Sequence, residues 1–295
     1  MSIEATRLLG ARAPSPVQEV STTCVSGSVL LDNEVHIWRV SLNQSSERTA
    51  FSFEVLSPDE RAKAARFHFD KDRNQFVQAR AALRFILSEY LDADPRTLEF
   101  SYGPQGKPCL VSEVRECGTG VSPVNHAQDA RATNKSLRFN LSRRDGLALI
   151  AVTRDREIGV DVELVRADLS FFQIADVSFS STEVATLRNL PESARVKGFY
   201  NCWTRKEAYV KAHGAGLSFP LKQFDVSLTP GDPSQLLQIH DDLDRIDRWT
   251  MREIPVAENY VAALVVEGTD LNVMCRDSEP FQATCSSTDG AVARP

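Results

Sequence analysis

Two stretches of the chain repeat apolar side chains at the spacing of an α-helix. The first, residues 74–91, carries apolar or aromatic side chains at i, i+7, i+11 and i+14 counted from Phe76. The second, residues 199–212, is followed by Gly214, the residue type at which helices often end. The pattern therefore predicts two long amphipathic helices. Three side chains of the second are four residues apart and share one stripe: Trp203, Glu207 and Lys211.

Other segments alternate apolar and polar side chains as strands do. Residues 157–164, EIGVDVEL, place Ile158, Val160, Val162 and Leu164 on one face and Gly159, Asp161 and Glu163 on the other. Residues 138–153 predict a hairpin around a turn at residues 143–146, and strand patterns recur at 224–228 and 259–266. The chain thus combines predicted helices with predicted strands, and we expect an α+β fold.

The order of these elements repeats between the two halves. FNLS at 139–142 is echoed by FDVS at 224–227, and GLALIAV at 146–152 by NYVAALVV at 259–266. We expect two similar α+β subdomains, 31–153 and 154–275, packed as a pseudo-twofold intramolecular dimer with the active site in the cleft between them. Residues 1–30 and 276–295 lack periodicity and are expected to be mobile tails, and 111–136 is expected to be an inserted loop.

Composition excludes some classes of function. The net charge of −6 argues against general affinity for nucleic acid, since phosphate binding needs a basic surface. The six cysteines have neither CxxC nor metal-ligand spacing, which favours free thiols in a reducing cytoplasm. The first residues contain no apolar signal segment, and the longest apolar run, at 260–266, is too short to span a bilayer. We expect a cytoplasmic protein without membrane or nucleic-acid partners.

The polar face of residues 157–164 is the first candidate for chemistry. Asp161 and Glu163 point the same way about 7 Å apart, and no basic residue alternates with them on that face. The simplest interpretation is a solvated strand face, and Glu207 with Lys211 would then be a surface ion pair. The alternative is that a hard cation such as Mg²⁺ relieves the repulsion, with Glu207 as a third carboxylate and Lys211 beside a bound phosphate.

The first half supplies cationic and hydroxyl side chains that suit phosphate. Seven basic residues lie between positions 61 and 84, and this region could hold an anion. Lys107 lies in a GKP turn, and Ser142 with Arg143 follows a predicted strand. Together with Lys63 and Arg73, these residues would form a cationic wall facing the carboxylates, although each one alone is more often a solvated surface residue.

Taken together, the motifs resemble the 4'-phosphopantetheinyl transferases of the two-domain, surfactin-synthetase-activating (Sfp-like) group. The similarity runs from about residue 56 to residue 266 and includes, in family order, LSPDERAKAARF, YGPQGKPCL, FNLS, GVDVEL, FSSTE and FYNCWTRKEAYVKAHGAGLSFPL. It implies an enzyme that moves the 4'-phosphopantetheine group of coenzyme A onto a serine of an apo acyl or peptidyl carrier protein. The reaction it implies is Mg²⁺-dependent and releases 3',5'-ADP.

The resemblance also implies roles for single residues. Asp161, Glu163 and Glu207 match metal ligands, Glu207 also matches the base that accepts the serine proton, and Lys211 matches the lysine on the pyrophosphate. The positions implied to contact coenzyme A are Lys63, Lys107 and Ser142, with Arg73 and Arg143 as further candidates. Arg73 lies near a coenzyme-binding basic position of the family, but the local alignment puts Gln75 closest to it. Arg143 stands where many family members have histidine.

Three further expectations concern partners and alternatives. A carrier protein would dock on an apolar surface around Phe171, Phe172 and Phe179, unless these side chains belong to the core. An internally duplicated chain is expected to be a monomer. The competing hypotheses are a coenzyme A-binding or carrier-docking protein without turnover, supported by Arg143 and the insertion, and a different Mg²⁺-dependent phosphotransferase.

Overall fold

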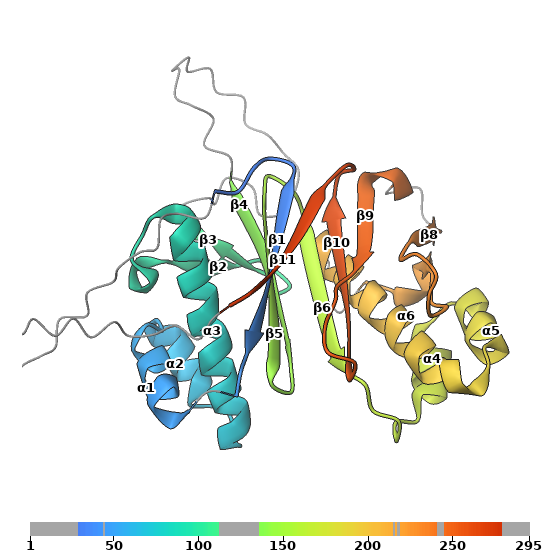
Figure 1. The fold of residues 1–295 in the computed structure, drawn as a ribbon, viewed down its shortest axis with the longest axis horizontal. Coiled ribbons are helices and arrows are strands. Elements are labelled where there is room, and N and C mark those ends of the chain that lie inside the picture. The colour runs from blue at the N-terminus through green and yellow to red at the C-terminus, as the bar shows by residue number, and fades with distance from the viewer. Residues whose placement is uncertain are drawn as a thin grey trace, which may run out of the picture.

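The structure, a computed structural model, describes residues 29–43, 45–111, 136–214, 216, 219–240 and 245–278. Most of the expected tails and of the expected inserted loop lies outside these residues. The fold is α+β, with two sheets side by side in the centre and a group of helices on each outer side (Figure 1). None of the helices in the described ranges has the length and apolar character needed to cross a membrane.

The first sheet has the strand order β11-β1-β5-β4 and is covered by three helices. Its strands are β1 (Glu34–Ser41), β4 (Leu137–Arg144), β5 (Leu147–Arg154) and β11 (Asn272–Asp277). The helices are α1 (Ser46–Glu54), α2 (Pro58–Ala64) and α3 (Asp70–Leu91). A 3₁₀ turn, Pro95–Thr97, and the short pair β2 (Phe100–Tyr102) and β3 (Pro108–Leu110) follow α3.

The second sheet has the order β6-β10-β9 and is covered on its far side by α6. The strands are β6 (Ile158–Leu164), β9 (Trp249–Glu253) and β10 (Tyr260–Glu267). The helices are α4 (Phe171–Ser178), α5 (Ser181–Asn189) and α6 (Glu192–His213). The pair β7 (Phe224–Val226) and β8 (Leu236–Ile239) and two 3₁₀ turns, Leu221–Gln223 and Ile246–Arg248, complete this half.

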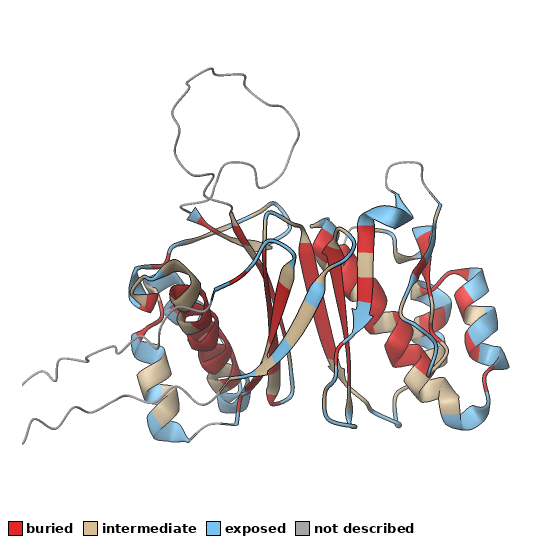
Figure 2. Cartoon of the chain, turned by 45° about the horizontal axis from the view of Figure 1, so that its top comes forward, coloured by how far each residue is buried: buried red, intermediate tan, exposed pale blue. Residues whose placement is uncertain are grey.

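The alternation predicted for β6 is confirmed and explains the layers. Val160 and Val162 are buried in an apolar cluster with Ile37 and Leu149, and this cluster joins the two sheets. The opposite face of β6 meets α6. Because both faces of the strand are covered, buried residues concentrate in the middle of the molecule (Figure 2).

The end of the chain differs from the expected division. Residues 272–277, placed mostly in the second half from the sequence, form β11 and pair in parallel with β1 of the first sheet. The side chains along this strand alternate only between exposed and intermediate. The hydrophobic pattern that marks the other strands is therefore weak in residues 272–277, and these residues form a strand because they pair with β1.

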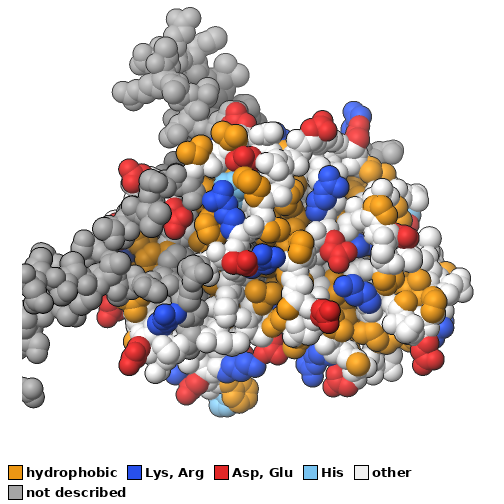
Figure 3. Space-filling model, in the orientation of Figure 1, with side chains coloured by type: hydrophobic (Ala, Val, Ile, Leu, Met, Phe, Trp, Pro, Cys, Tyr) orange, Lys and Arg blue, Asp and Glu red, His pale blue; other side chains and the backbone are white. Residues whose placement is uncertain are grey.

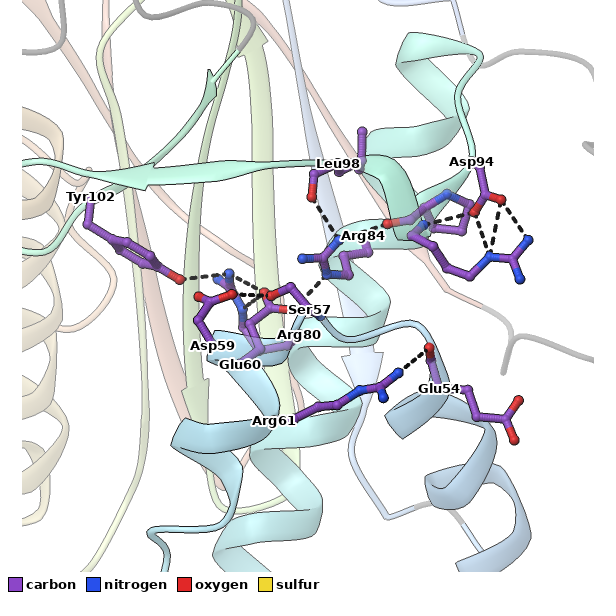
Figure 4. Close-up of polar contacts among 12 residues, drawn as sticks. Glu54, Ser57, Asp59, Glu60, Arg61, Arg80, Arg84, Asp94, Leu98 and Tyr102 are labelled. Carbon is purple, nitrogen blue, oxygen red and sulfur yellow. Dashed lines mark hydrogen bonds and ion pairs between the residues drawn. The ribbon is translucent and has the colours of Figure 1, made fainter.

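A buried ion pair recurs in both halves. Glu60 of α2 accepts hydrogen bonds from Arg80 and Arg84 of α3, each at 2.7 Å (Figure 4). Glu183 of α5 is paired with Lys206 of α6 at 2.8 Å. Each glutamate also accepts the backbone N–H of the serine three residues before it, and α3 and α6 have 22 residues each. This repetition is what an internal duplication would produce.

The ion pair in the first half corrects one expectation. Arg80 and Arg84 belong to the basic run that was expected to hold an anion, but both are buried and bound to Glu60. Arg84 also donates to the carbonyl oxygens of Pro95 and Leu98. These two arginines hold α2, α3 and the following turn together, because a buried guanidinium must find acceptors inside the protein.

Candidate active site between the two halves

The site forms where α6 lies directly against β6, and Gly159 allows that approach. A Cβ atom at this position would lie 2.1 Å from the carbonyl oxygen of Ala208 and 2.3 Å from the backbone nitrogen of Ala212. Only glycine fits so close a contact with a helix backbone. The contact brings Lys211 of α6 over Asp161, two residues along β6 from the glycine.

Asp161 is the centre of a small polar cluster. It is 4% exposed, and its Oδ1 accepts hydrogen bonds from Lys211 Nζ at 2.6 Å and Ser142 Oγ at 3.0 Å. Its other oxygen, Oδ2, is buried without a hydrogen-bond partner. An unpartnered buried carboxylate oxygen is expensive, so this atom is the one in the cluster that most needs a ligand.

Glu163, two residues further along β6, is paired with Arg144 at the end of β4, with 3.0 Å between Nε and Oε2. Burial raises the pKa of Glu163 and the charge of Asp161 raises it further, while Arg144 and Lys211 oppose this shift. No basic residue alternates with the carboxylates along β6, as the sequence showed, but the inference that their repulsion is uncompensated is wrong, because Arg144 pairs with Glu163 and Lys211 with Asp161. The cations come from β4 and α6, so they could not be read from the pattern of β6 itself.

Glu207 lies one turn before Lys211 on α6, as the spacing predicted. Burial raises the pKa of Glu207 and so does the nearby charge of Asp161, against the opposing effect of Lys211. A carboxylate with a raised pKa is a stronger base than a solvated one. Trp203, on the same stripe, stacks on Phe199 at a ring-centroid distance of 6.1 Å and anchors the helix to the core.

A pocket of about 690 Å³, its open mouth included, lies beside these residues. Its lining comes from both halves and includes Gln105, Lys107, Asn140, Glu207 and Lys211. Gly214 and Gly216 complete its rim with positive φ angles of 75° and 65°. A Cβ atom on Gly216 would lie 2.6 Å from that of Gln105, so the glycine lets the two halves meet closely.

Lys107 reaches this pocket but is held by protein groups. Its Nζ donates to Glu157 at 2.8 Å and to the carbonyl oxygen of Ala212 at 3.1 Å. The second contact places a cation at the C-terminal end of α6, where the helix dipole favours it. In this structure Lys107 therefore ties the first half to the end of α6.

The other side chains expected to contact coenzyme A lie in separate places. Ser142 faces β6 and Asp161, whereas the neighbouring Arg143 points to the opposite face of β4 and lies over the rings of Phe67 and Phe76. Lys63 lies 5.7 Å from the centroid of the Phe76 ring, so it shares that surface with Arg143. Arg73 is bound to Asp70 one turn away at 3.0 Å.

Comparison with known proteins identifies the family of the chain. Family models match residues 157–265 as the 4'-phosphopantetheinyl transferase superfamily and residues 41–155 as the N-terminal part of a 4'-phosphopantetheinyl transferase. The 4'-phosphopantetheinyl transferase HetI of Nostoc sp. is 36% identical over 81% of this chain and 90% of its own. The chain belongs to the 4'-phosphopantetheinyl transferase superfamily.

More distant members of the superfamily also align. The 4'-phosphopantetheinyl transferase Sfp of Bacillus subtilis is 28% identical over 63% of this chain and 72% of its own. The human L-aminoadipate-semialdehyde dehydrogenase-phosphopantetheinyl transferase is 23% identical over 73% and 68%. A solved structure of the Thermotoga maritima holo-[acyl-carrier-protein] synthase covers 38% of this chain and 62% of its own, with 20% identity and a TM-score of 0.32, which is too low to support an argument.

The three phenylalanines expected on a docking surface have different environments. Phe179 is 1% exposed and contacts Phe199, so it belongs to the core. Phe171 and Phe172 are half-buried and contact each other. Of the three, these two alone could touch a partner, which removes Phe179 from the docking hypothesis.

Sequence reasoning missed several residues of the site. Arg144 and Asn140 face β6 from β4, and Glu157 binds Lys107 at the start of β6. The alternation of polar side chains along β4 was visible in the sequence. The pattern of a single strand does not tell, however, which neighbouring element its polar face meets.

Proposed function

We propose that this protein transfers the 4'-phosphopantetheine group of coenzyme A to a serine of apo acyl or peptidyl carrier proteins. The reaction gives holo-carrier protein and 3',5'-ADP and depends on Mg²⁺. The observation that carries this proposal is the meeting of Asp161, Glu207, Lys211 and Ser142, from three elements of both halves, beside one pocket. The superfamily named above gives the reaction type.

The carboxylates suit a hard divalent cation. Within the described residues, no group of three or more His, Cys, Asp or Glu side chains is arranged to hold a metal ion as it stands. The donor chemistry nevertheless fits, because Asp161 Oδ2 is unpartnered and the pKa values of Glu163 and Glu207 are raised partly by the charge of Asp161. We assign Asp161, Glu163 and Glu207 as the Mg²⁺ ligands. Bound Mg²⁺ would neutralise charge on the pyrophosphate oxygens.

The remaining chemistry belongs to side chains of α6. The serine Oγ of the carrier forms a bond to the β-phosphorus of coenzyme A, and the bond from that phosphorus to the oxygen of the leaving 3',5'-ADP breaks. Glu207 accepts the serine proton, directly or through water, and its raised pKa suits that role. Lys211 places its ammonium group against the pyrophosphate and stabilises the charge that develops there.

Binding of coenzyme A would use the first half. Ser142 and Lys107 line the approach to Lys211, and Arg143 with Lys63 forms a cationic surface around Phe76 for a terminal phosphate. Arg73 contributes to this surface after leaving Asp70, since that pair is exposed and weak. Arg143 keeps its charge at every working pH, unlike a histidine at the same position.

Partners and organisation follow from the same proposal. The protein acts in the cytoplasm as a monomer with no nucleic-acid or membrane partner. Its subdomains are 31–153 and 154–271, and residues 272–277 join the first of them as β11. Acidic and basic side chains are interspersed over the face seen in Figure 3, without a broad basic area on that face. Phe171 and Phe172 are the side chains proposed to meet the carrier protein.

The decisive experiment is intact-mass analysis of several apo carrier proteins after incubation with coenzyme A, Mg²⁺ and the enzyme. Wild type should add the mass of phosphopantetheine to the carrier serine, and Glu207→Gln should lose at least about 100-fold in rate. Glu192→Gln is the matched control, because Glu192 is an exposed glutamate on the same helix. Bound coenzyme A without mass gain on any carrier would support a binding protein without turnover and overturn the proposal.

A further inference from the structure

One face of β4 forms a polar seam with β6. Its residues with even numbers face β6 and are Arg138, Asn140, Ser142 and Arg144. Asn140 and Ser142 accept the backbone N–H groups of Val160 and Val162, so side chains take the place of a strand ladder between the two sheets. The side chains of this seam therefore set how the two halves meet at the site.

The two ends of the seam carry the same kind of ion pair. At one end Arg138 lies 3.8 Å from Glu157, and at the other Arg144 lies 3.0 Å from Glu163. Only the second pair involves a carboxylate of the cluster around Asp161. Arg144 is 48% exposed and Glu163 is 18% exposed, so the arginine has open solvent into which it can move while the carboxylate stays in place.

We propose that Arg144 is an internal counter-ion that competes with the divalent cation for Glu163 and so sets the affinity of the site for metal. This inference rests on the proposed function, which makes Glu163 a metal ligand. Arg144 occupies Oε2 of Glu163, and a ligated cation at that oxygen would face a guanidinium at hydrogen-bond distance. Like charges repel at this range, so metal binding at that oxygen requires Arg144 to move away.

Arg144 acts here as a positioning residue. Without metal, it holds the Glu163 side chain toward β4 and reduces its repulsion from Asp161 and Glu207. Lys211 does the same for Asp161 but is only 29% exposed and remains in the site to meet phosphate. Two side-chain cations, Arg144 and Lys211, thus balance the three neighbouring carboxylates. Arg144 is the more exposed of the two cations and is the one that the metal displaces.

The test is a titration with Mn²⁺, with free Mn²⁺ measured by electron paramagnetic resonance, on protein alone and with coenzyme A. Arg144→Gln should bind Mn²⁺ about two- to fivefold more tightly than wild type, the range expected for removing a half-exposed ion pair. Arg144→Lys keeps the charge and should stay near wild type. The matched control is Arg138→Gln, which removes an arginine from the same face of the same strand and should leave Mn²⁺ affinity unchanged.

The outcomes separate this inference from the proposed site. Weaker or unchanged Mn²⁺ binding by Arg144→Gln, in a protein whose circular dichroism and urea midpoint match wild type, would overturn the role of Arg144. Absence of Mn²⁺ binding by wild type, or no loss in Glu163→Gln, would overturn the metal site and the inference with it. Tighter binding by Arg144→Gln and Arg138→Gln alike would reduce the effect to net charge and overturn the specific competition.

Discussion

Replacing Gly159 by alanine tests the contact on which the site is built. The added Cβ would lie 2.1 Å from the Ala208 carbonyl oxygen and 2.9 Å from the Lys211 carbonyl carbon. Both atoms belong to the backbone of α6, so no change of rotamer can relieve the clash. The helix has to move away from β6 by about 1 Å for the closest contact to reach 3.0 Å.

That displacement predicts a loss in both stability and rate. Inserting a methyl group into a tight interface costs about 1–3 kcal/mol. The shift acts on Lys211, whose Nζ is now 2.6 Å from Asp161, and on Glu207 one turn earlier. A displacement of about 1 Å in catalytic groups can lower the rate about 100-fold. We therefore expect kcat for carrier modification to fall by that order even where the protein stays folded.

The measurements are the urea midpoint and kcat for transfer to an apo carrier protein. Gly198→Ala on α6 is the matched control, because its Cβ would meet mainly the side-chain methyl group of Leu190, at 2.5 Å, which can move. It should retain most of the activity. A Gly159→Ala protein with the wild-type urea midpoint and a kcat within twofold of wild type would refute the argument that Gly159 sets the position of α6.

Three further predictions follow from the charged groups. Glu207→Gln should raise the urea midpoint at pH 7.5 in EDTA and lose this advantage below about pH 4. The raised pKa of Glu207 means that ionisation of this side chain is less favourable in the folded than in the unfolded protein. Ionisation therefore destabilises the fold as pH rises, and this effect is absent below the unfolded-state pKa. Equal midpoints of wild type and variant at both pH values would contradict this reasoning. Lys206→Met should cost about 3–5 kcal/mol in urea unfolding because it strands the Glu183 carboxylate, and adding Glu183→Gln should recover part of that loss. No recovery would mean that the pair is not coupled. Arg143→His should make KM for coenzyme A rise between pH 6 and 8, where wild type stays flat; parallel profiles would remove Arg143 from the coenzyme site.

Much of the architecture could be predicted because it depends on periodicity. The alternation of β6 predicted its apolar and polar faces, and the helical spacing predicted that Glu207 and Lys211 share one face of a helix, which lies beside Asp161 in the structure. The predicted helix at 74–91 is observed as Asp70–Leu91, and the one at 199–212 as Glu192–His213. The early start of α6 was missed because the polar turn at its beginning has no apolar stripe, and boundaries are the least determined part of a pattern.

Long-range pairing could not be predicted from the same signals. Arg80 and Arg84 belong to a basic run that was expected to hold an anion, yet both are buried against Glu60 (Figure 4). The pairing of β11 with β1 joins residues more than 200 positions apart. A periodic pattern indicates which face of an element is covered, but not which element covers it. The covering element determines whether a charged residue on that face finds a partner.

Lys206 and Glu207 show how this limit acts on adjacent residues. On a helix, consecutive side chains point about 100° apart, and here Lys206 enters the core while Glu207 faces the pocket. Lys206 Nζ donates to the carbonyl oxygens of Leu221 and Phe224 and pairs with Glu183, so its position fixes the rotation of α6 about its own axis. The same rotation directs Glu207 and Lys211 toward Asp161. Lys206 is buried and touches no reacting group. By fixing the rotation of α6, it nevertheless orients the two residues that are proposed to react.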